Sequence, residues 1–94
     1  MKIHPLVRSL KATLPDAEFT LLSERDWCSM TFAGQQIVVE CTTLEDQRID
    51  AWVTTLPERK FSIPNLLVAD IAVTSLKNDN GRYAILIEAL VIDA

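Results

Sequence analysis

The chain has 94 residues, of which 49% are hydrophobic, and a formal net charge of −4 with a pI near 4.8. A chain of this length and hydrophobicity predicts one domain over residues 1–94 with a packed core, and not intrinsic disorder. The basic residues are scattered along the sequence, which argues against a phosphate-binding stripe and against nucleic-acid binding. No uncharged apolar run reaches the ~18 residues that a membrane span needs.

The start of the chain predicts a short amphipathic helix over residues 4–14. Pro5 suits the first turn of a helix, leucines recur every fourth residue from Leu6 to Leu14, and Pro15 ends the pattern. We expect this helix to pack on a sheet. The same residues are too interrupted by polar and charged side chains to be a secretory signal, so a cytoplasmic location is expected.

Alternating apolar residues predict the next strands. Residues 17–23 alternate as a strand, and the polar run at 23–26 predicts a turn. Residues 27–33 and 36–42 then predict a hairpin around Gly34, because glycine at the first central position is typical of a two-residue type II′ turn.

That hairpin places Cys28 directly opposite Cys41. A disulfide is geometrically conceivable there, but we favour two reduced core residues of a cytosolic protein. A structural zinc site needs about four Cys or His ligands, and His4 is the only histidine that could join the two cysteines. No metal site and no Cys-His or Ser-His catalytic pair is therefore expected. Because both glycines serve turns, no phosphate-binding loop and no cofactor are expected either.

Residues 43–56 carry two competing patterns. Thr43 with Asp46 resembles a capping box, and Ile49 and Trp52 begin a helical stripe, so we favour a helix. The β-branched run that starts at Val53 favours a strand instead. A strand here would change the architecture to a mostly-β two-layer fold.

The C-terminal residues 66–92 predict a second hairpin around Asn78-Asp79-Asn80-Gly81. We favour a type I turn with a bulge at Gly81, which makes a three-residue loop and pairs Thr74 with Leu86, Ala72 with Glu88 and Asp70 with Leu90. A two-residue turn at Asn80-Gly81 is the alternative, and it would shift the pairing by one residue.

The favoured register gives the hairpin two different faces. One face has no charge and carries Leu67, Ala69, Ile71, Val73, Ile85, Ile87, Ala89 and Val91. The other face carries Val68, Asp70, Ala72, Thr74, Leu76, Ala84, Leu86, Glu88, Leu90 and Ile92. If helices cover the first face, the second needs another cover, since leaving its large apolar residues in water wastes burial energy and invites aggregation.

Asp70 and Glu88 lie diagonally on this second face. Two carboxylates on an apolar face are one arrangement used for acid-base chemistry. We favour solvated acids that set the orientation of a bound protein, with a small acid-base enzyme as the alternative. The binding hypothesis names a single set of residues, Val68, Asp70, Leu86, Glu88, Leu90 and Ile92.

These expectations combine into an α+β fold with an antiparallel five-stranded sheet, order α-β-β-β-α-β-β, and helices on one face. We expect a small acidic protein-binding module that forms a homodimer and is not an enzyme. An inhibitor borne by a phage or mobile element would fit the size and charge. The element order also resembles that of the small acidic dimeric chaperones of bacterial secretion systems, although the final helix of that family is missing. That resemblance implies an adaptor role.

Overall fold

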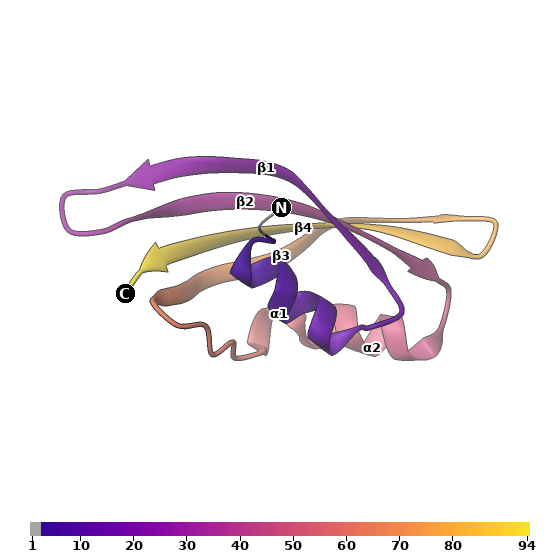
Figure 1. Ribbon diagram of the computed structural model, residues 1–94. Coiled ribbons are helices and arrows are strands. Elements are labelled where there is room, and N and C mark those ends of the chain that lie inside the picture. The colour runs from indigo at the N-terminus through magenta and orange to yellow at the C-terminus, as the bar shows by residue number, and fades with distance from the viewer. Residues whose placement is uncertain (1–2) are drawn as a thin grey trace.

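The computed structural model describes residues 3–94 and has an α+β architecture (Figure 1). Its elements are α1 (Pro5–Thr13), β1 (Glu18–Cys28), β2 (Ala33–Leu44), α2 (Gln47–Thr55), the 3₁₀ turn η1 (Leu56–Glu58), β3 (Leu66–Asp79) and β4 (Arg82–Asp93). The strands form an antiparallel four-stranded sheet in the order β1-β2-β4-β3. The α+β class, the antiparallel sheet and the two helices are confirmed, whereas the expected five strands are wrong.

The missing fifth strand reflects two misplaced turns. The polar run at residues 23–26 lies inside β1, and Gly34 lies inside β2. The reversal between β1 and β2 is instead made by residues 29–32. There the Ser29 hydroxyl accepts hydrogen bonds from the backbone N–H groups of Thr31 and Phe32, at 3.4 and 3.1 Å. The element order is therefore α-β-β-α-β-β.

The sheet contains three bulges, each adding one unpaired residue to a strand. They fall at Leu22 in β1 and at Ala69 and Thr74 in β3, while the β2–β4 pairing is continuous. Because side chains alternate along a strand, each bulge exchanges the faces on which the following residues lie.

The β3–β4 turn is the two-residue alternative. Asp79 pairs with Arg82, and the two turn residues have positive φ angles, 55° at Asn80 and 81° at Gly81, as a type I′ turn requires. The favoured three-residue loop is therefore wrong. The bulge at Thr74 compensates for this difference, so Ala72 still pairs with Glu88 and Asp70 with Leu90, as expected.

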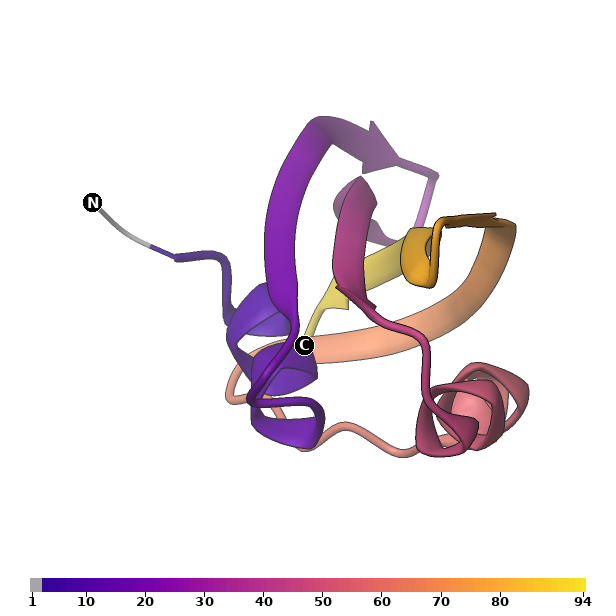
Figure 2. The same cartoon turned by 90° about the vertical axis from the view of Figure 1, so that its right-hand side faces the viewer.

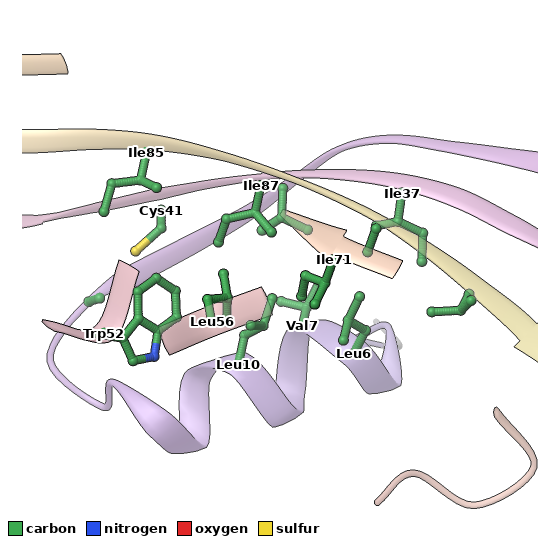
Figure 3. Packing of buried hydrophobic residues seen from close by; sticks show 14 of the residues in the cluster. Leu6, Val7, Leu10, Ile37, Cys41, Trp52, Leu56, Ile71, Ile85 and Ile87 are labelled. Atoms are coloured by element: carbon green, nitrogen blue, oxygen red, sulfur yellow. The ribbon is translucent and has the colours of Figure 1, made fainter. Parts of the chain in front are cut away.

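Both helices lie on one side of the sheet, below it in Figure 1. We call this helix-covered side of the sheet the inner face. In Figure 3 the side chains of Ile37, Cys41, Ile85 and Ile87 point from the sheet towards the helices, and all four are buried. The strong twist of the sheet is visible when the molecule is viewed from its end (Figure 2).

The two helices form where local signals place them. Helix α1 matches the expected 4–14 within one residue at each end, and the His4 ring nitrogen Nδ1 accepts a hydrogen bond from the Leu6 N–H, at 3.0 Å. Helix α2 starts later than expected. Its cap is Asp46, whose carboxylate accepts from the Arg48 N–H at 2.8 Å, whereas Thr43 belongs to β2 and forms no capping box.

Within residues 3–94, no helix has the length and apolar character required to cross a membrane.

Candidate functional site

The side of the sheet opposite the helices is the candidate site, and we call it the outer face. Its cross-strand rows, read from β1 through β2 and β4 to β3, are Glu18/Thr42/Ala84/Lys77, Thr20/Glu40/Leu86/Ser75, Ser23/Val38/Glu88/Ala72, Arg25/Gln36/Leu90/Asp70 and Trp27/Gly34/Ile92/Leu67. No element within residues 3–94 covers this face, as Figure 1 shows.

Apolar side chains run along the centre of the outer face. Leu86, Leu90 and Ile92 project from β4 and Val38 from β2, and all four are half-buried between their neighbours. By contrast, Ile85, Ile87 and Val91, which alternate with them on β4, are 0% exposed beneath the helices. Strand β4 therefore has one apolar side that is fully buried and one that remains accessible to solvent.

The structure brings five of the six expected binding residues onto this face, namely Asp70, Leu86, Glu88, Leu90 and Ile92. The sixth, Val68, was placed wrongly. It pairs with Val91 and packs against the helix-covered core, because the bulge at Ala69 moves the preceding residues to the opposite side. Leu67, 58% exposed, takes its place on the outer face.

Trp27 is an outer-face residue that the expected binding set did not include. It lies on β1 opposite Gly34, at the end of the row that contains Ile92 and Leu67. A straight β1 would turn Trp27 towards the helices, but the bulge at Leu22 turns it outwards. The apolar character of Trp27 was visible in the sequence, whereas the bulge that orients it has no clear local signal.

The carboxylates of the outer face are open to solvent. Asp70 and Glu88 are both exposed, and their pairing with Leu90 and Ala72 keeps them diagonal to one another, as expected. Neither lines the two cavities described below. Exposed carboxylates on an open sheet face can orient a partner by charge, whereas acid-base catalysis usually requires an enclosed pocket.

A cleft of about 860 Å³ lies between the end of α1, the start of β1 and helix α2, away from the expected site. Its walls contain four acidic residues and three arginines, so the charges nearly cancel. Two polar groups in its lining, the Trp52 indole and the Thr13 hydroxyl, have hydrogen-bond partners within the protein. Trp52 Nε1 donates to Thr13 Oγ1 at 2.8 Å, and that hydroxyl donates to the Leu10 carbonyl. The cleft therefore shows no donor set directed at a particular ligand.

A smaller cavity of about 430 Å³ lies beside Trp27 and Gly34, at the end of the sheet. Its lining includes Asp26, Cys28 and Asp93. Trp27 and Gly34 belong to the outer-face row that contains Ile92, so the cavity adjoins that end of the sheet.

His4, which the sequence left without a role, takes part in a hydrogen-bond chain. Its Nδ1 accepts from the Leu6 N–H, so Nε2 carries the proton and donates to Gln35 Oε1, at 3.1 Å. The Gln35 amide in turn donates to Glu24 Oε1 at 2.6 Å. The chain ties the start of α1 to β1 and β2, which is a structural role. No group of three or more potential metal ligands occurs within the described part of the chain.

The two cysteines lie apart. Cys28 is exposed and pairs with Ala33, whereas Cys41 is buried between Phe19 and Ile85, so the expected Cys28–Cys41 pair is wrong. The expected pairing required a turn at Gly34, whereas the turn between β1 and β2 lies at residues 29–32. Burial raises the pKa of the Cys41 thiol to about 11, although Lys11 opposes the shift. At neutral pH Cys41 is therefore protonated as well as inaccessible.

We predict that maleimide at pH 7.5 will label one thiol of the native protein rapidly and the second only on unfolding. The Cys28→Ser variant should lose the rapid phase, and Cys41→Ser should keep it. Quantification by intact-mass spectrometry checks the result. Equal labelling rates for both thiols in the native protein would contradict the burial of Cys41.

Comparison with known proteins identified no relative. No protein-family model, no curated protein and no solved structure matches the chain.

Proposed function

We propose that the chain is a small acidic protein-binding module that associates through its outer face, with a second copy of itself as the partner. The observation that supports this proposal is the line of apolar side chains on β4, namely Leu86, Leu90 and Ile92, that no described element covers. Burial of such a line on association removes apolar surface from water, which is the main favourable term in protein–protein binding.

The size of the outer face suits a self-complementary interface. Four strands spaced by ~4.8 Å and nine residues of β4 at ~3.4 Å each span roughly 600 Å² once side chains are included. Two such surfaces together bury about 1,200 Å², which lies at the lower end of the range for specific complexes. A face-to-face pair of sheets is also a common way to close an antiparallel sheet that has one open side.

Asp70 and Glu88 act in this proposal as orienting charges and not as catalysts. Both are exposed: Asp70 lies on the edge strand β3, where charged residues form the rim of an interface, and Glu88 lies on β4 between Leu86 and Leu90. We also propose a cytoplasmic location, which the unpaired state of Cys28 and Cys41 supports.

The test is the mass of the protein in solution. We expect light scattering to give a mass near twice the 10.5 kDa of the chain at micromolar to millimolar concentrations. Leu86→Glu should shift the protein to the monomer, because it places a third carboxylate beside Glu40 and Glu88 on a surface that must become dry. Leu86→Thr, which preserves strand propensity, should weaken association less.

The matched control is Gln47→Glu, which adds the same negative charge to the exposed first turn of α2, on the other side of the sheet. We expect it to leave the dimer intact. Circular dichroism of Leu86→Thr and Leu86→Glu separates loss of association from loss of folding. A wild-type chain that stays monomeric at every concentration overturns the proposal. The outer face would then be expected to bind a different protein, as in an inhibitor or adaptor.

A further inference from the structure

We propose that the two copies are related by a two-fold axis that runs along the strands, so that β1 of one copy lies over β3 of the other. This orientation rests on the self-association proposed above and adds to it the pairing of named charges. It follows from the distribution of charged and apolar residues across the outer face.

Opposite charges occupy opposite ends of two cross-strand rows. One row begins at Arg25 on β1 and ends at Asp70 on β3, and another begins at Glu18 on β1 and ends at Lys77 on β3. All four side chains are exposed, and the only ion pair within residues 3–94 joins Arg48 to Asp46. The four charges are thus free to pair with another molecule.

A two-fold axis along the strands lays each row over the same row of the partner, in reverse order. Arg25 then lies over the partner's Asp70, and Glu18 over the partner's Lys77, and symmetry repeats each contact. In the apolar end row, Trp27 lies over the partner's Leu67. Every end of these rows therefore meets a complementary group.

The other in-plane axis, which runs across the strands, lays β1 over β1. Placed so that Arg25 meets the partner's Glu18 and Asp70 meets the partner's Lys77, it lays Ile92 over the partner's Arg82 and Leu67 over the partner's Asp79. Apolar side chains would then cover charges that lose water without gaining a counter-charge. The charges and the apolar end row together select the first axis.

The centre of the outer face limits the affinity of this arrangement. Glu40 and Glu88 lie in adjacent rows on the central strands, so Glu40 comes close to the partner's Glu88. Like charges that approach on association oppose it, and the complementary charges at the edges offset this repulsion. Orientation by edge charges is therefore the specific role that we assign to Arg25, Asp70, Glu18 and Lys77.

Charge reversal at two positions tests the orientation. Arg25→Asp alone and Asp70→Arg alone should each raise the dissociation constant of the homodimer by about tenfold, because each creates two repulsive contacts. A mixture of the two single variants should form a heterodimer in preference to either homodimer, since both of its contacts are attractive. The double variant should self-associate like the wild type.

Native mass spectrometry of the mixture and sedimentation equilibrium at low salt give the readouts. Lys60→Asp, a charge reversal in the exposed connection before β3, is the control and should not change self-association. A monomeric wild type overturns both proposals. A dimer that Leu86→Glu dissociates, but whose charge variants show no preference for the heterodimer, overturns the orientation alone.

Discussion

Replacing Gly34 by alanine should destabilise the protein by about 3 kcal/mol or more, which is a large fraction of the stability of a small domain. Gly34 lies in β2 where the strand pairs with β4, opposite Ile92. A methyl group added there would meet the carbonyl oxygen of Val91 far inside van der Waals contact, and would lie 2.9 Å from the Ile92 Cα. These are backbone atoms of a central strand, so they cannot move aside without disturbing the β2–β4 pairing.

Gly81→Ala is the matched control for this substitution. Gly81 has a left-handed φ of 81° but open space around it, so alanine there meets only the conformational cost of ~1–2 kcal/mol. Urea denaturation followed by circular dichroism at a fixed protein concentration compares the two variants. If Gly34→Ala unfolds at the wild-type midpoint, the close approach of β2 and β4 is not as described.

Replacing Trp52 by alanine should cost roughly 3–5 kcal/mol of unfolding free energy. Trp52 projects from α2 into the core and is 4% exposed, with its ring edge-on to Phe19 at a centroid separation of 6.3 Å. Its Nε1 also donates to Thr13 Oγ1 at 2.8 Å, which connects α2 to the last turn of α1. The alanine variant loses the packing and the link between the two helices at once.

Two smaller changes separate these contributions. Thr13→Val removes the hydroxyl, which accepts from Trp52 Nε1 and donates to the Leu10 carbonyl, and should cost ~1–2 kcal/mol, mainly because it leaves the indole N–H without its partner. Trp52→Phe keeps most of the apolar surface, and adding Thr13→Val to it should cost less than Thr13→Val costs alone. Denaturant melts of the single and double variants measure the coupling. Full additivity would show that the Thr13–Trp52 hydrogen bond contributes nothing.

Patterns formed by residues close together in the sequence correctly predicted helix α1 and the inner face of β4. The leucine repeat and Pro5 identified α1, and the alternation from Ile85 to Val91 identified the inner face of β4. Both signals are short-range, because they follow from the periods of a helix and a strand. Gly34 shows where such reasoning fails. Its role is the close approach of two strands, which no local pattern distinguishes from a turn.

The candidate site was predicted in part for a similar reason. Asp70, Glu88 and Leu90 reached the outer face although the turn was assigned wrongly, because the bulge at Thr74 compensates for the one-residue shift. Val68 lies on the inner face instead. The second bulge, at Ala69, shifts the pairing by one more residue, and no further bulge between Ala69 and Leu66 reverses that shift. The position of a bulge depends on packing against the rest of the sheet, so one strand read alone cannot locate it.

The three bulges also bear on whether further chains can add to the edges of the sheet. They all fall on β1 and β3, which are the two edge strands, while the central strands β2 and β4 pair without interruption. An uninterrupted edge exposes a regular row of N–H and C=O groups to which further chains can add without limit. Bulges break that regularity, so growth of fibrils by edge-to-edge addition is disfavoured at both edge strands, β1 and β3.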